Sequence, residues 1–204
     1  MIRAPWWPAY ALVVGSGCSS GPPPRTFLLD APLQNAAYPS QQVGEQAVQV
    51  QAVMLPDYLD TEDILLRDSA HELQASANGR WGERLSSGMT HALTAALVTR
   101  LPNYRVEADR PTDGRARRIQ VDVDAFDVWR DGRCALSASW TILQPAAGSV
   151  PTTRREVFVT PAVKASAAGD ATVVAAMAAT IDKLADALAA DLTSPVSPQI
   201  STAR

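Results

Sequence analysis

The sequence predicts an α+β fold: a two-layer domain in which a mixed or antiparallel sheet of six to eight strands carries two helices packed on one face. Several short segments alternate apolar and polar residues with a period of two, which is typical of half-buried strands. Two longer stretches place apolar residues every three or four positions, as amphipathic helices do. Two helices among so many strands favour one layer of helices over one layer of sheet.

The composition is that of a folded protein. The chain has 204 residues, which is the usual size of one domain with tails. Hydrophobic residues make up 47% and charged residues 19%, so the body is not intrinsically disordered. A net charge of -3 argues against a nucleic-acid-binding protein, and two His and two Cys are too few for a zinc-finger or disulfide scaffold.

The N-terminus has the features of an export signal, and residues 1–17 are predicted to be a signal peptide. The apolar run Trp6–Val14 is too short to span a membrane but has the length of a signal-peptide core. Small residues then precede Cys18. This arrangement resembles a bacterial lipoprotein signal, in which the cysteine becomes the lipid-carrying first residue of the mature chain. A plain secretory signal with a chance cysteine is the alternative.

Residues 18–26 are predicted to be a lipid-bearing tether. Three consecutive prolines favour an extended spacer that rises about 3.1 Å per residue. Ser19 and Ser20 follow the cysteine, and by resemblance to lipoprotein sorting signals the absence of Asp at these positions favours the periplasmic face of the outer membrane. A covalent lipid on Cys18 is the only non-protein group we expect. Cys134 then has no partner for a disulfide and is expected to be a small buried apolar residue.

The domain is expected to span residues 27–192, followed by a disordered tail over 193–204. Alternating or short apolar runs predict a series of strands in the first half and the middle of this domain. The predicted strands cover residues 27–29, 47–55, 64–66 and 72–76 (a hairpin), a segment starting at 104, 118–143 (a hairpin) and 154–160.

The segment 118–143 gives the clearest local prediction. Asp131-Gly132 is typical of a two-residue type I′ hairpin turn. Such a turn places Val121 opposite Ile142 and Val123 opposite Trp140. Beyond Ala125 the apolar residues fall on the opposite face of the strand. Either a bulge therefore lies nearby, or both faces are covered at that end.

Two helices are predicted. The first follows a turn at Asn78-Gly79, carries one apolar stripe from Leu85 to Leu101, and is ended by Pro102. The second covers residues 171–192, with Asp170 as its N-cap. Its apolar seam consists of Val174, Met177, Ile181, Leu184, Leu188 and Leu192.

Residues of the types that could carry out catalysis or bind metals are present, but they form no pattern that indicates an active site. His71-Glu72 begins like a zinc-protease motif, but Ala75 stands where the second histidine is needed. Asp122, Asp124 and Asp127 are interpreted as a solvated strand edge, with cation binding as the alternative. We therefore expect no enzymatic activity and no metal.

One set of motifs is more specific than the general pattern. The residues VMLPDYLD (53–60) are followed by ILLR (64–67) and then by RWGERL (80–85). Together with Cys18 and the later VDVDAFD (121–127), they resemble the ABC-type transport auxiliary lipoprotein family. The resemblance covers nearly all of residues 18–192.

The resemblance implies a non-enzymatic role as an accessory subunit of an intermembrane lipid transport system. The expected partners are a periplasmic protein with a mammalian-cell-entry (MCE) domain, its ABC-type or integral-membrane components, and the outer-membrane lipid that receives the anchor. A homo-oligomer is also possible. A lipoprotein cofactor of another envelope machine, such as a cell-wall synthase activator, is the alternative.

The candidate docking residues are Pro56, Asp57, Tyr58, Leu59 and Trp81. Two interpretations stay open for Tyr58 and Trp81. Each aromatic ring either packs over the end of the core or belongs to a patch presented to a partner, since aromatic residues are enriched at binding hot spots. We expect Pro56–Leu59 and Trp81 to lie close together.

Overall fold

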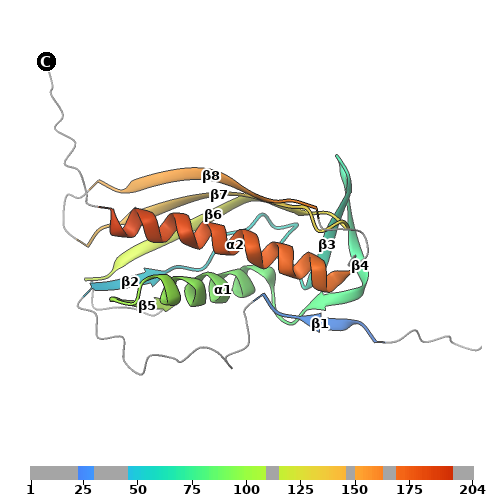
Figure 1. The fold of residues 1–204 in the computed structure, drawn as a ribbon, viewed down its shortest axis with the longest axis horizontal. Coiled ribbons are helices and arrows are strands. Elements are labelled where there is room, and N and C mark those ends of the chain that lie inside the picture. Colours follow the sequence, from blue (N-terminus) through green and yellow to red (C-terminus); the bar gives the residue numbers. More distant parts are fainter. Residues whose placement is uncertain (1–22, 30–45, 109–114, 146–149, 163–168, 195–204) are drawn as a thin grey trace, which may run out of the picture.

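Among the residues that a computed structural model describes, eight strands in two sheets and two helices make up the fold (Figure 1). The structure describes residues 23–29, 46–108, 115–145, 150–162 and 169–194. The α+β class predicted from the sequence is confirmed. The eight strands, however, divide into a sheet of five and a sheet of three.

The larger sheet has the strand order β5-β2-β6-β7-β8. Strand β2 runs parallel to both β5 and β6, whereas β6, β7 and β8 are antiparallel. The sheet is therefore mixed, and β5 and β8 form its two edges. The bounds are β2 Gln46–Val50, β5 Tyr104–Ala108, β6 Arg117–Val128, β7 Cys134–Leu143 and β8 Thr152–Thr160.

The smaller sheet has the order β1-β4-β3. Strands β3 (Asp63–Ser69) and β4 (Glu72–Trp81) form an antiparallel hairpin, and β1 (Arg25–Phe27) runs parallel to β4. In Figure 1 this sheet stands at the end of the molecule where α2 begins.

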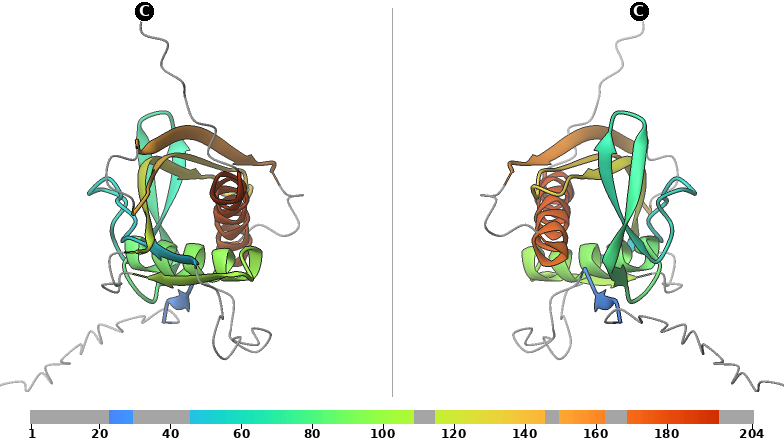
Figure 2. Two further views of the ribbon diagram at one scale, coloured as in Figure 1. Left: turned by 90° about the vertical axis from the view of Figure 1, so that its left-hand side faces the viewer. Right: turned by 90° about the vertical axis from the view of Figure 1, so that its right-hand side faces the viewer.

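The helices α1 (Leu85–Arg100) and α2 (Asp170–Thr193) pack against each other and against the strands. Figure 2 looks along α2 and shows the larger sheet curving around it. Leu184 and Leu188 of α2 are fully buried, and the helix contacts β7 and β8. Because apolar residues recur at helical spacing on both helices, one continuous core forms between the helices and the sheet.

The turn between β6 and β7 differs from the sequence prediction. The N–H of Trp129 donates to the carbonyl of Arg133 at 2.9 Å, and Gly132 has a φ of 78°. The loop therefore has three residues and ends in a left-handed glycine, in place of the predicted two-residue turn. The longer loop shifts the pairing by one residue, and a bulge shifts it by one more, so that Val121 lies opposite Trp140 rather than Ile142. Of the two alternatives considered near Ala125, a bulge is present, between Val123 and Ala125.

Other predicted boundaries also differ. The expected turn at Asn78-Gly79 lies inside β4, the expected strand 47–55 ends at Val50, and the first strand is Arg25–Phe27. Asp170 is the first residue of α2 rather than its N-cap, which is Gly169. Its carboxylate instead accepts a hydrogen bond from Ser76 Oγ at 2.7 Å.

The predicted seam of α2 is buried except at its start. Val174 is only partly buried, and Val173 occupies the core in its place.

Strand β4 and the first turn of α2 meet at the bond between Ser76 and Asp170, which connects the smaller sheet to the helical layer.

Candidate functional site

The chain that follows β2 is fixed to β6 and α1 before it reaches the candidate docking residues. The N–H of Met54 donates to Val121 O, and the N–H of Val123 donates to Met54 O, both at 2.9 Å. The N–H of Val53 donates to the buried hydroxyl of Thr90 on α1 at 2.9 Å. These three bonds hold the start of the loop on two different elements.

The motif residues that follow are divided between the surface and the core. Pro56 accepts a hydrogen bond from the N–H of Leu59 at 2.9 Å, which closes a tight turn. Leu59 is only 3% exposed, whereas Tyr58 is 44% exposed and Asp57 is exposed beside it. The turn thus anchors itself by Leu59 and presents Tyr58 to solvent.

Trp81 belongs to the core. It is 3% exposed, and its backbone N–H donates to the carbonyl of Glu62 at 2.7 Å. The next residue, Gly82, donates its N–H to Phe27 O at 2.8 Å. The two aromatic residues therefore differ. Trp81 packs in the core, whereas Tyr58 is exposed to solvent. Leu59 and Trp81 both belong to the buried core, which extends through the described domain.

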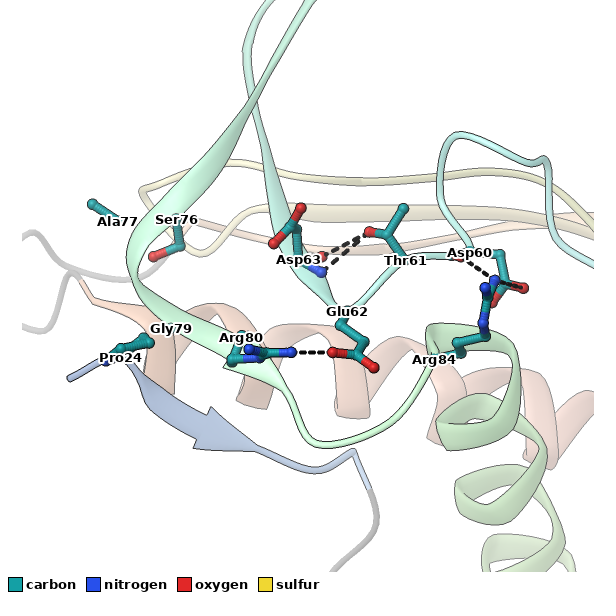
Figure 3. A pocket seen from close by; sticks show the side chains of 10 residues that line it. All are labelled: Pro24, Asp60, Thr61, Glu62, Asp63, Ser76, Ala77, Gly79, Arg80 and Arg84. Atoms are coloured by element: carbon teal, nitrogen blue, oxygen red, sulfur yellow. Dashed lines mark hydrogen bonds and ion pairs between the residues drawn. The ribbon is translucent and has the colours of Figure 1, made fainter.

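A polar groove of about 560 Å³ lies beside the motif (Figure 3). It is lined by Pro24, Asp60, Thr61, Glu62, Asp63, Ser76, Ala77, Gly79, Arg80 and Arg84. Four of its charged side chains form two ion pairs, Arg80 with Glu62 and Arg84 with the partly buried Asp60. Within the described ranges, no group of three His, Cys, Asp or Glu residues could hold a metal ion.

Asp60 connects the motif to α1. One carboxylate oxygen accepts a hydrogen bond from the backbone N–H of Ser86 at 3.1 Å, and Arg84 donates to the carbonyl of Asp60 at 3.1 Å. Burial alone would raise the pKa of Asp60, but the hydrogen bonds from Ser86 and the charge of Arg84 lower this pKa overall, below its usual 3.8. The carboxylate therefore stays charged at the positive end of the helix.

Two residues of this site were not anticipated from the sequence. Asp60 accepts a bond from a residue 26 positions later, and Thr90 from one 37 positions earlier. Because the partners are so far apart in the sequence, no local sequence pattern indicates either bond. Cys18 lies outside the described residues, and none of the helices in the described part is long and apolar enough to cross a membrane.

Solved structures of other proteins have the same fold as this chain. A crystal structure of an uncharacterized protein matches with a TM-score of 0.68 and 19% identity, covering 84% of this chain and 100% of that one. The crystal structure of protein XCC0632 from Xanthomonas campestris matches with a TM-score of 0.58 and 17% identity, covering 81% and 90%. These matches define an α+β domain that occurs in other proteins.

The chain belongs to the ABC-type transport auxiliary lipoprotein component family, whose model matches residues 27–189. It is 26% identical over 137 residues to the intermembrane transport lipoprotein PqiC of Escherichia coli (strain K12) and, with the same values, of Shigella flexneri. The match covers 67% of this chain and 73% of each relative. The resemblance inferred from the motifs is therefore confirmed, and the family is one of transport auxiliary lipoproteins, not of enzymes.

Proposed function

We propose that this protein is a lipid-anchored, non-enzymatic docking subunit of an MCE-type intermembrane lipid transport system. Membership of the auxiliary lipoprotein family supports the general role. In this proposal, acylated Cys18 tethers the domain to the periplasmic face of the outer membrane. The folded domain then holds the periplasmic MCE protein, which connects to the ABC-type or integral-membrane components of the system.

The observation that carries the docking role is the exposure of Tyr58 on a loop that cannot move freely. The loop is hydrogen-bonded to β6 at Met54 and to α1 at Val53, and it is pinned in the core by Leu59. A rigid, half-exposed aromatic ring loses little conformational entropy when it is covered. Such rings are common among binding hot spots.

The test compares Tyr58→Ala with Trp81→Ala. Full-length protein is crosslinked in envelopes, and the recovery of the MCE partner is measured alongside the melting temperature of each purified variant. Tyr58→Ala should weaken binding by more than ~1 kcal/mol, as hot-spot aromatic residues do, without a matching loss of stability. Trp81→Ala should lower stability by about 3–5 kcal/mol, the usual cost of truncating a buried aromatic ring.

Val150→Ala is the matched control, because Val150 is an apolar residue that is 84% exposed elsewhere on the surface. It should change neither readout. Unchanged partner recovery for Tyr58→Ala, with the variant fully folded, would move the docking face away from this loop. Recovery of a cell-wall synthase in place of an MCE protein would contradict the proposed transport role.

A further inference from the structure

The polar groove beside Asp60 lies next to the point where the N-terminal segment enters the fold. Pro24 lines the groove and directly precedes β1, and the neighbouring strand β4 supplies Gly79 and Arg80 to the same groove. Pro24 is six residues after Cys18. Because an extended chain spans at most about 3.6 Å per residue, Pro24 stays within about 22 Å of Cys18. An acylated Cys18 therefore keeps this groove near the membrane surface, a step that rests on the anchor of the proposed function.

The groove carries charges of both signs. Its lining includes three carboxylates, on Asp60, Glu62 and Asp63, and two guanidinium groups, on Arg80 and Arg84. A purely anionic ligand would meet an excess of carboxylates, and a purely cationic ligand would meet the two arginines. A zwitterionic ligand with a phosphate and an ammonium group complements both sets of charges. The volume of about 560 Å³ is within the usual range for small-ligand clefts.

The carboxylate of Asp63 has unused binding capacity. Among the described residues, no hydrogen bond or ion pair reaches this carboxylate, and the bonds between Asp63 and Thr61 involve only the backbone of Asp63. Asp63 lies opposite Arg80 in the pairing of β3 with β4, yet Arg80 bonds to Glu62 instead. Figure 3 shows the Asp63 side chain pointing away from this ion pair. An ammonium group can therefore bind Asp63 without breaking an ion pair.

The two arginines keep donors for a phosphate. Arg84 uses only Nη1 in its described bonds, which go to Asp60, and its side chain is 67% exposed. Arg80 uses only Nη2, in its bond to Glu62, and its side chain is 47% exposed. A guanidinium group has five N–H donors, and phosphate oxygens are among their strongest acceptors. Both side chains can therefore bind a phosphate while their ion pairs stay in place.

An exposed apolar side chain lies on the same face of the N-terminal segment as Pro24. The side chains of Thr26 and Leu28 both lie close to the position that a Cβ on Gly82 would take, at 3.1 and 2.9 Å, so they share one face. Alternation along a strand places Pro24 on that face as well. Leu28 is 54% exposed. A charged groove followed by an exposed leucine matches a lipid, which has a polar headgroup and apolar tails, better than a free phosphate ester.

We propose that this groove binds the headgroup of a phosphoethanolamine lipid in the leaflet that holds the anchor. The headgroup phosphate binds Arg80 and Arg84, and its primary ammonium group binds Asp63. This second contact fixes the orientation of the domain on the membrane, which a single tether at Cys18 does not do.

Carbodiimide coupling tests the proposal, because this reagent joins a carboxylate to a primary amine that touches it. The full-length acylated protein is reconstituted in vesicles of phosphatidylethanolamine and phosphatidylcholine, and lipid-modified peptides are quantified by mass spectrometry. Asp63 should be modified at least tenfold more than Asp68, an exposed carboxylate on the same strand. Asp68 lies about 17 Å farther along β3, towards the hairpin turn, so the headgroup in the groove does not reach it.

An arginine substitution separates binding from accidental proximity. Arg84→Gln should lower the modification of Asp63 at least fivefold, because the phosphate loses one of its two guanidinium partners. Arg118→Gln is the matched control, since Arg118 is an exposed arginine of β6 that does not line the groove. It should leave the modification unchanged. Both variants should melt at the wild-type temperature because both side chains are exposed.

A soluble headgroup identifies the source of the ligand. Glycerophosphoethanolamine, added to the protein in vesicles of phosphatidylcholine alone, should modify Asp63 at least tenfold less than the lipid does. Equal modification by the two sources would overturn the lipid assignment. Equal modification of Asp63 and Asp68, or unchanged modification in Arg84→Gln, would overturn the binding site.

Recovery of the protein in salt-washed vesicles reports on the anchor separately. Loss of the wild-type protein from the vesicles would overturn the anchor and this inference together. Retention in the vesicles without selective modification of Asp63 would overturn this inference alone. Neither result depends on whether Tyr58 binds an MCE partner.

Discussion

The carboxylate of Asp60 accepts a hydrogen bond from the backbone N–H of Ser86 at 3.1 Å, so that a residue from the candidate motif caps a helix that begins 25 residues later. The residue before the helix, Arg84, has no acceptor on its side chain and makes no capping bond of its own. The first turn of a helix leaves backbone N–H groups unsatisfied, and a carboxylate there is favourable. The motif and the helix are therefore fixed to each other.

Replacing Asp60 by Ala should destabilise the domain. The cost expected for a lost N-terminal cap is about 1 kcal/mol, within a range of roughly 0.5–2 kcal/mol. The midpoint of urea unfolding measures this change. Asp57→Ala is the control three residues earlier, because Asp57 is exposed and should stay within about 0.5 kcal/mol of wild type. Equal midpoints for the two variants would show that Asp60 does not cap α1.

The same residue makes stability depend on pH. The folded-state pKa of Asp60 is lowered below 3.8 because the hydrogen bonds from Ser86 and the charge of Arg84 outweigh its burial. A carboxyl of this kind stabilises the fold above its unfolded pKa, and the contribution is lost as the pH falls through its folded pKa. The difference in unfolding free energy between wild type and Asp60→Asn should therefore be constant near neutral pH and shrink below about pH 4. A difference that grows on acidification would contradict this.

The sequence predicts the parts of the fold that depend on local pattern. The first helix begins and ends within one residue of the predicted stripe, because both the apolar period and Pro102 are local signals. The class of fold and the bulge near Ala125 follow for similar reasons. The register of the hairpin does not, because Asp131-Gly132 suits both a two-residue and a three-residue loop, and the bulge adds a second shift of one residue.

Long-range relationships explain the remaining differences. Gly79 suggests a turn in sequence, but in the structure it is buried inside β4 against Asp170, which lies 91 residues away. The division of the strands into two sheets likewise depends on pairings such as that of Arg25 with Gly79. The sequence identified the candidate site as a motif, but only the structure separates exposed Tyr58 from buried Trp81.

Gly79 should not tolerate a side chain. A Cβ at this position would lie 2.6 Å from Asp170 Oδ2 and 3.0 Å from Phe27 Cε2. Gly79→Ala should therefore displace the Asp170 carboxylate from Ser76 and destabilise the domain by about 1–3 kcal/mol, the usual range for overpacking. Thermal unfolding followed by circular dichroism measures this change.

Combining Gly79→Ala with Asp170→Ala provides the control. Asp170→Ala removes the closest clashing atoms, so the double variant should lose less stability than the sum of the two single variants. Asn78→Ala, at the exposed neighbouring position, should have little effect. Strict additivity of the two changes would show that Gly79 and Asp170 do not compete for the same space.

Membrane attachment should depend on Cys18. Cys18→Ala removes the proposed site of acylation, and the acyl chains supply about 0.8 kcal/mol of membrane affinity for each buried CH₂ group. The variant should leave the outer-membrane fraction after a high-salt wash. Cys134→Ala is the control, because Cys134 is fully buried in the described domain and should leave attachment unchanged. Retention of Cys18→Ala in the washed membrane would show that another feature anchors the chain.

The second helix should be essential for folding rather than an appendage. Leu184 is fully buried at the centre of α2, so Leu184→Asp would bury an unpaired charge and cost several kcal/mol of unfolding free energy. Ala190→Asp, at an exposed position of the same helix, should cost far less. A chain that ends at Ala168 lacks all of α2 and should be unfolded, whereas a chain that ends at Thr193 should melt like wild type, because α2 ends there. An unshifted, cooperative melt of the shorter chain would show that the sheets fold without this helix.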